Sequence, residues 1–276
     1  MPVTKAQLTA FADTHSWRIP FDTSPRHLAG PGDARHVTHG LAAAGWKHLS
    51  DPLSPQIEMR SPDARYSLRF DPQSSVSSWW MLSAQATDTE PGWYATFGEF
   101  VPAELIGALT DALLTPPAEQ LPDVSSALTS AGWRHAPGSE QTTSPDGMCR
   151  FEQERLAGYS ANEQSWRFEA CRLGYDLPRG SRIWHATFDD RAPVHLVHAF
   201  ACALADPAPL QRGMHDRTAD FHVHQEPSPL TPEQVVAAHT SRLDAIRAQV
   251  RAARRQHQAQ ARSAQVRPSL PAARRR

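Results

Sequence analysis

The chain has 276 residues, 40% hydrophobic and 21% charged, which is enough for two domains that each bury a core. Its net charge of −1 hides an uneven distribution: residues 230–276 carry a net +8, from ten Arg against Glu233 and Asp244, and residues 1–229 carry −9. An acidic body with a basic tail excludes a uniformly basic nucleic-acid-binding surface.

The cysteines and the lengths of the apolar runs indicate the cellular compartment that we expect. Three cysteines without a CxxC pair, Cys149, Cys171 and Cys202, favour a reducing environment over a disulfide scaffold or a zinc ribbon. No apolar stretch approaches the ~18 residues of a membrane span, and the first residues do not form a signal peptide. We therefore expect a cytoplasmic protein without a membrane partner.

The first expected elements are a short helix and an added strand. Thr4 and Gln7 form a capping box for a helix over residues 4–15, within an N-terminal segment placed at 1–19. Residues 21–32 are predicted as an extra edge strand that ends in a Gly-Pro-Gly turn. A proline between two glycines suits a turn better than a phosphate-binding loop.

Repeat one is placed at residues 20–117. A helix over 36–44 should end at Gly45, and segments with alternating apolar and polar residues then predict an antiparallel meander of four or five strands. Pro102 starts a closing helix whose apolar positions recur every three or four residues and make one buried stripe.

Repeat two is placed at residues 118–205, because the motifs of repeat one return there in the same order. The matching segments, 83 to 91 residues apart, are 44–48 with 131–135, 61–63 with 144–146, 93–97 with 184–188, and Leu113 with Leu204. So many ordered matches indicate an internal duplication. The predicted fold is α+β: two tandem antiparallel-sheet repeats, each closed by a C-terminal helix, followed by a basic helix and tail.

The segments after the repeats are predicted as a linker and a helix. Residues 206–230 are Pro-rich and are expected to be a linker. Thr231 and Pro232 then start an Arg-rich helix in the segment 231–276, whose end is expected to be disordered. A heptad-like stripe along this helix could pair with a helix of another chain; its positions are Val236, His239, Leu243, Ile246, Val250 and Ala253.

The repeated motifs resemble a known family. Residues 27–33 lead to His36–His39, and the segments 44–46, 61–63 and 93–97 follow in order. This order resembles the tandem actinobacterial proteins of Streptomyces-type genomes that are catalogued as domain of unknown function 317, over roughly residues 20–205. The resemblance implies a fold but little chemistry. In topology alone, each unit is similar to the plant Whirly proteins and the PC4-like coactivator fold, which bind single-stranded DNA.

Catalysis has little support in the sequence. The phosphate-loop, nucleophile-elbow, zinc-protease and dinucleotide-binding signatures are all missing, so we expect no enzyme, no catalytic residue, no cofactor and no metal site. Asp189 and Asp190 could be an acid/base pair, but their place before a helix N-terminus explains them better. Histidine pairs without a clear third ligand suggest surface or half-buried helix positions, or a solvated linker for the last pair, rather than zinc; these are His36/His39, His195/His198 and His222/His224.

The tryptophans and the period-two pattern divide each sheet into two faces. Three matched pairs are predicted to be core: Trp46/Trp133, Trp80/Trp166 and Trp93/Trp184. Trp79 lies out of phase, so it could be an exposed platform on which a base stacks, or it could pack at the sheet edge. The opposite face should be polar; it carries Ser67, Arg69, Met81, Ser83, Tyr94 and Thr96, then Arg150, Glu152, Arg167, Glu169, His185 and Thr187.

Two functions follow as hypotheses. The leading one is a non-enzymatic nucleic-acid-binding protein, with single-stranded DNA as the expected form, held by the polar sheet face and the basic tail. Its candidate site residues are Arg69, Trp79, Tyr94, Arg150, Arg167, His185, Arg251, Arg254 and Arg255. The alternative is a protein-interaction module that uses the C-terminal helix to bind an acidic partner or a second copy. In that case the polar sheet face is an ordinary solvated surface, which explains its composition equally well.

Overall fold

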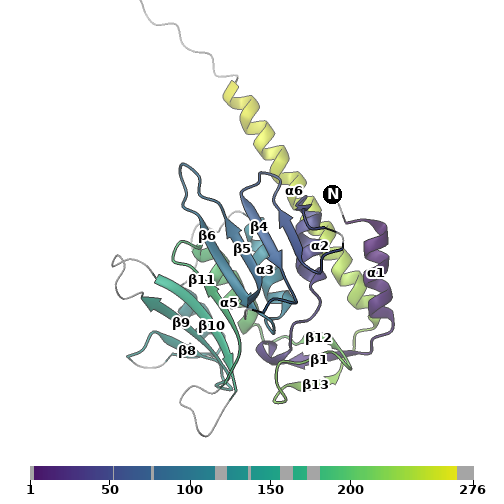
Figure 1. Cartoon of the computed structure of the whole chain (residues 1–276), viewed down its shortest axis with the longest axis vertical. Coiled ribbons are helices and arrows are strands. Elements are labelled where there is room, and N and C mark those ends of the chain that lie inside the picture. The colour runs from purple at the N-terminus through teal and green to yellow at the C-terminus, as the bar shows by residue number, and fades with distance from the viewer. Residues whose placement is uncertain are drawn as a thin grey trace, which may run out of the picture.

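Ten antiparallel strands form one continuous sheet, and each half of the sheet comes from one repeat (Figure 1). The computed structural model describes residues 3–51, 53–75, 78–115, 123–135, 138–155, 164–172 and 181–265. Repeat one supplies β2 (Lys47–His48), β3 (Ile57–Arg60), β4 (Tyr66–Phe70), β5 (Ser78–Ala84) and β6 (Trp93–Gly98). Repeat two supplies β7 (Arg134–His135), β8 (Gln141–Thr143), β9 (Cys149–Arg155), β10 (Gln164–Cys171) and β11 (Arg182–Phe188). The order β2-β3-β4-β5-β6-β11-β10-β9-β8-β7 confirms the α+β class and mirrors the duplication.

The two halves meet where β6 pairs with β11. Thr96 lies opposite its own repeat equivalent, Thr187, while Ala95 faces Phe188 and Phe97 faces Ala186. Exchanging the repeats leaves this register unchanged, so a pseudo-twofold axis passes through the Thr96/Thr187 pair. The two predicted sheets are therefore fused into one, because a separate sheet in each repeat would leave β6 and β11 as unpaired edges.

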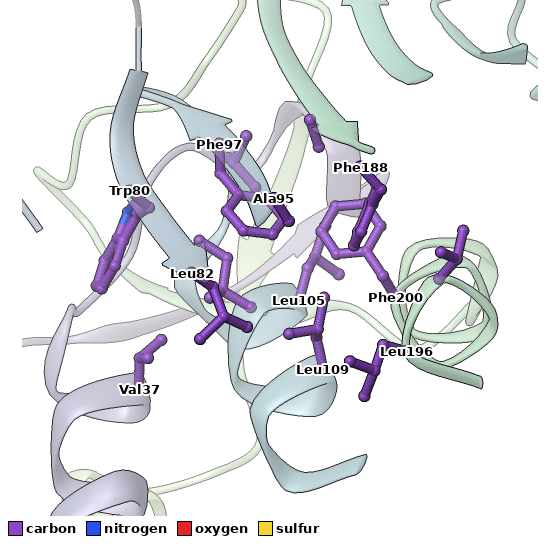
Figure 2. Close-up of a cluster of buried hydrophobic side chains, with 14 of the residues drawn as sticks. Val37, Trp80, Leu82, Ala95, Phe97, Leu105, Leu109, Phe188, Leu196 and Phe200 are labelled. Atoms are coloured by element: carbon purple, nitrogen blue, oxygen red, sulfur yellow. The ribbon is translucent and has the colours of Figure 1, made fainter. Parts of the chain in front are cut away.

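Helices of both repeats cover one face of this sheet (Figure 1). They are α2 (Arg35–Ala43) and α3 (Ala103–Leu113) of repeat one, and α4 (Val124–Ser130) and α5 (Val194–Ala205) of repeat two. The two closing helices α3 and α5 pack against each other, with α2 beside α3 and α4 beside α5. Figure 2 shows how Phe97, Phe188 and Phe200 meet between the sheet and these helices, with Leu105 and Leu109 below them.

Alternation along the strands creates this core. In β6, Trp93, Ala95 and Phe97 are buried while Tyr94 points outward, because successive side chains of a strand face opposite sides. The matched tryptophans behave as predicted: Trp46, Trp80, Trp93, Trp133, Trp166 and Trp184 are all at most 8% exposed.

A second, three-stranded sheet corrects two expectations. The segment predicted as an extra edge strand forms β1 (Pro20–Ser24), which is the central strand, between β12 (Leu210–Gly213) and β13 (His224–Pro227). The segment 206–230, expected as a linker, thus contains two strands and buries Leu210, Arg212 and Asp220. Its prolines end the strands instead of preventing them; Pro227 is the last residue of the edge strand β13.

The Gly-Pro-Gly turn after the short 3-10 helix η1 (Arg26–Leu28) lies between the start of α3 and Arg212 of β12 with the segment that follows it. Gly30 and Gly32 both have a positive φ, +78° and +65°. A Cβ at Gly30 would lie 2.1 Å from the carbonyl oxygen of Arg217, and one at Gly32 would lie 2.9 Å from the guanidinium of Arg212. The glycines therefore allow a close backbone approach that no other residue permits.

Two further helices pack outside α2. The helix α1 (Lys5–Ser16) begins with the predicted capping box, in which Thr4 and Gln7 bond each other's backbone N–H groups. The helix α6 (Pro232–Gln265) lies against α1 and α2 and buries His239, Leu243 and Ile246 there. The apolar stripe expected to pair with another chain is thus covered by this chain's own helices. The expected disordered end of the tail lies outside the described residues, and none of the described helices is long and apolar enough to cross a membrane.

Candidate nucleic-acid interface

The sheet face opposite the helix layer, here called the open face, is hydroxyl-rich in repeat one and also carries Lys47, Glu58 and Arg60 on β2 and β3. Ser67 and Ser83 lie across from each other on β4 and β5, with their hydroxyls 2.9 Å apart. Two predicted site residues reach solvent here: the Arg69 side chain is exposed, and Tyr94 is 50% exposed. Arg60 of β3, opposite Ser67, is exposed on this face as well, so this half offers a ring and two guanidinium groups to a ligand.

In repeat two the same face is a lattice of opposite charges. Arg150 on β9 forms an ion pair with Glu169 on β10 and lies 3.8 Å from Glu152. Arg167 lies opposite Glu152 in the register of these two strands. The sequence correctly placed Arg150 and Arg167 on this face, but their neighbours are carboxylates, which makes this half a poor surface for phosphate.

Two other predicted residues come together in a shallow hollow of about 370 Å³, where β5 and β11 begin and β6 ends. Trp79 and His185 both line it, together with Arg182 and the serine loop before β5. Trp79 is half-buried rather than exposed, since its ring meets that of Phe70 edge-on at 6.3 Å. His185 lies 3.4 Å from the Ser78 hydroxyl, and burial together with nearby Arg182 lowers its pKa, so the imidazole is neutral at physiological pH.

The third part is the end of α6, residues 251–265, which we call the basic arm. Leu243 and Ile246 are buried and Val250 is half-buried against the body, but Arg254 and Arg255 are exposed. The arm has four Arg and no Asp or Glu. Figure 1 shows this end of the helix extending beyond the sheet and its helices.

The arm leaves the body beside the β2 edge of the large sheet. The Arg254 guanidinium lies next to Gly45, where a Cβ would be 3.5 Å from it, and the turn at Pro62 is adjacent. The hollow lies at the other end of the repeat-one strands, near Ser78. The structure therefore groups Trp79 with His185, and Arg251 with Arg254 and Arg255, but does not join the two groups.

Sequence reasoning missed Arg182, the exposed cation beside the hollow. It is the first residue of β11 and lies 3.6 Å from Glu169. Its place beside the hollow depends on the pairing of β11 with β6, which the sequence does not show. Asp189, considered as an acid, instead accepts a hydrogen bond from the Tyr94 backbone N–H at 3.1 Å. Within the described ranges, no group of three or more His, Cys, Asp or Glu residues is arranged to hold a metal ion.

Comparison with known proteins bears on the repeats and not on the arm. Both repeats match one family model, SPDY, a domain of unknown function (DUF317). The matched residues are 60–119 and 143–210, which contain β4 to α3 and β9 to α5. The two SPDY segments confirm the tandem arrangement, and they hold Tyr94 and His185 while the basic arm lies outside both. No curated protein and no solved structure matches the chain.

Proposed function

We propose that the protein binds nucleic acid and that the basic arm makes the main contact with phosphates. The observation that supports this proposal most is that α6 continues past its last packed turn with arginine as its only charged residue type. At ~1.5 Å per residue, the part beyond Ala253 is on the order of 18 Å long. The Arg254 guanidinium still lies beside Gly45, but the helix that follows extends away from the acidic body, whose net charge of −9 would repel phosphate.

The chemistry of arginine suits this role. Its guanidinium stays charged at every physiological pH and binds phosphate with two parallel hydrogen bonds. Each phosphate neutralised on a nucleic acid releases condensed counterions, so such binding weakens steeply as salt rises.

Single-stranded nucleic acid is the form that the open face favours. Tyr94 and the hollow at Trp79 and His185 offer rings on which unpaired bases can stack. Arg69 and Arg182 are exposed cations on this side of the chain. A strand that runs along repeat one from the hollow to Gly45 would reach the arm without crossing the carboxylates of repeat two.

The experiment is a fluorescence-anisotropy titration of a labelled 20-nucleotide single strand and its duplex, at salt concentrations from 50 to 200 mM. The test variant replaces Arg251, Arg254 and Arg255 with Gln. We expect it to bind at least tenfold more weakly at low salt, and to flatten the slope of log K against log salt by about 2, as the loss of three phosphate contacts requires.

Two controls separate charge from fold. The same three positions changed to Lys keep the charge and should retain most of the affinity, and Arg191→Gln, an exposed arginine of the body, should change nothing. Binding that survives the Gln variant would move the site to the open face, where Tyr94→Ala tests it. The absence of salt-dependent binding to either oligonucleotide would refute the proposal.

A further inference from the structure

A cavity of about 290 Å³ lies where α6 begins, between that helix, α1 and the small sheet. Its walls are largely apolar and come from segments far apart in the chain. They include Pro20 of β1, Leu210 of β12, Leu230 just before α6, and Val235 of α6. A half-enclosed apolar cavity with a few polar groups is the usual form of a small-molecule site, and this one has the size of a small pocket.

The charged side chains around the cavity neutralise one another. Arg212, at the wall, donates to both carboxylate oxygens of Glu104, at 2.6 and 2.9 Å, and its remaining donors reach backbone carbonyls. The other pairs are Arg18 with Asp216 at 3.0 Å, Asp33 with Arg35 at 2.6 Å, and Arg242 with Asp111 at 2.7 Å. No charge around the cavity is left to balance an ion, so the lining favours an uncharged occupant.

Polar atoms without a hydrogen-bond partner gather around the same cavity. Of the five such buried side-chain atoms in the described part of the chain, three belong to residues of its lining: Gln211 Oε1, His239 Nδ1, and His15 Nε2, whose nearest polar neighbour is the Asp33 carboxylate at 3.6 Å. They come from α1, β12 and α6. Buried polar atoms are nearly always paired, so a small rotation that brings them to a polar occupant would lower the free energy. Gln211 Oε1 can only accept, and it therefore requires a donor.

We propose that this cavity binds a small, uncharged, largely apolar molecule that carries a hydrogen-bond donor. Its apolar part would cover Leu210 and Val235, and its donor would satisfy Gln211. The site does not depend on nucleic-acid binding, because no arginine of the basic arm lines the cavity.

The test uses the full chain and ligand-observed NMR or calorimetry with four probes. Indole is neutral, apolar and has one N–H; 1-methylindole lacks that donor; benzoate and benzylamine carry opposite charges. We expect indole to bind, 1-methylindole to bind at least fivefold more weakly, and the two charged probes at least tenfold more weakly.

A matched pair of variants locates the binding. Both Ala237 and Ala238 of α6 are exposed, but only Ala238 lines the cavity. Ala238→Phe should fill the cavity and weaken indole at least tenfold, while Ala237→Phe should leave it unchanged, with thermal melts showing that both variants fold. The inference fails if no neutral probe binds, which would mean that the cavity holds only water. It also fails if benzoate equals indole, or if the two variants act alike.

Discussion

In repeat one the indole N–H of Trp93 is buried with no hydrogen-bond partner among the described residues, whereas the equivalent N–H of Trp184 donates to the carbonyl of His27 at 2.8 Å. His27 also hydrogen-bonds Asp146 in the Ser-Pro-Asp turn of repeat two, at 2.8 Å. Asp63, at the same place in repeat one, is exposed and receives no such bond. The segment around η1 thus supports one copy of a duplicated structure and not the other.

The open face differs in the same way. The hydroxyl pair Ser67/Ser83 of repeat one becomes the ion pair Arg150/Glu169 at the equivalent positions of repeat two. The helix layer is also unequal, because α1 and α6 cover α2 while α4 has no such cover from them. The duplicated strands and turns stay alike, and divergence is greatest where the added segments attach or where solvent begins.

What remains alike is visible in the Ser-Pro-Asp turns. In both, the serine hydroxyl donates to the aspartate carboxylate, and a backbone N–H five residues on donates to the serine oxygen at 2.9 Å. Ala64 and Gly147 occupy the same position with φ of +62° and +75°. Both turns keep the same hydrogen bonds and a left-handed residue at the same position, although their surroundings differ. The turn is therefore required by the fold of each repeat and not by the segments packed around it.

The largest effect should come from the two buried tryptophans. Trp93→Ala and Trp184→Ala should each lower the free energy of unfolding by roughly 3–5 kcal/mol, as other buried aromatic truncations do. Phe at the same positions should affect the two repeats unequally. Trp184→Phe leaves the His27 carbonyl unpaired, so it should lower the free energy of unfolding by about 1–2 kcal/mol more than Trp93→Phe does. Denaturant titrations measure this, and equal losses for the two Phe variants would show that the His27 bond adds nothing.

The ion pair gives the next effect. Glu169→Ser leaves the half-buried Arg150 without its main partner and should cost about 2 kcal/mol, in the range of hydrogen bonds to charged groups. Adding Arg150→Ser recreates the hydroxyl pair of repeat one and should recover most of that loss. A double variant as unstable as the single one would mean that repeat two needs this charge pair.

The turn residues give a smaller effect of opposite sign in the two repeats. Gly147→Ala should destabilise by about 1 kcal/mol, because an L-residue is strained in the left-handed region. Ala64→Gly removes that strain and should be neutral or stabilising by up to about 1 kcal/mol. Thermal melts of both variants decide this, and a destabilising Ala64→Gly would argue that the two turns are not equivalent.

A mild decrease in pH should distinguish the two repeats by their stability. Burial lowers the pKa of His39 to about 4 and of His239 to about 3, with nearby Arg35 and His36 adding to the effect. Their rings lie together, Nδ1 to Nε2 at 3.2 Å, where α6 meets α2. The unfolded chain binds protons first, so the stability that the neutral rings contribute is complete above pH 6.5 and is lost as the pH falls towards 3.

The Ser-Pro-Asp turn of repeat two should respond only at lower pH. Burial would raise the pKa of Asp146, but the hydrogen bonds from His27, Ser144 and the Met148 backbone, together with the charge interaction with His27, outweigh it and lower that pKa to about 2. Its contribution is therefore present above pH 3.8 and is lost between there and pH 2. Hydrogen exchange at pH 5 should show weaker protection in α1, α2 and α6 than at pH 7.5, with β9 and β10 unchanged after correction for intrinsic rates; β11 is left out of the comparison because it carries His185, whose pKa burial also lowers. The reverse order would invalidate this assignment.

Sequence reasoning reached the features that depend on local pattern. Period-two alternation identified the buried face of β6 and β11, and the ordered motifs identified the duplication. It missed the small sheet because β1 and β12 are short strands that pair across about 190 residues, for which no local pattern exists. It overestimated the charge of the open face for a related reason: the partners of Arg150 depend on strand register, which composition does not contain.

The register at β6 and β11 means that the protein is a covalently tied dimer of half-proteins. A single repeat cut between α3 and α4 would expose β6 or β11 as an open edge with half of the central aromatic cluster bare. Two copies of repeat one could close that edge with the same register, Thr96 facing Thr96. Joining the halves in one chain replaces a concentration-dependent encounter with an intramolecular one at a high effective concentration. In a symmetric dimer of identical copies, every substitution appears in both halves. In the joined chain a substitution changes one half only, so the two halves can differ.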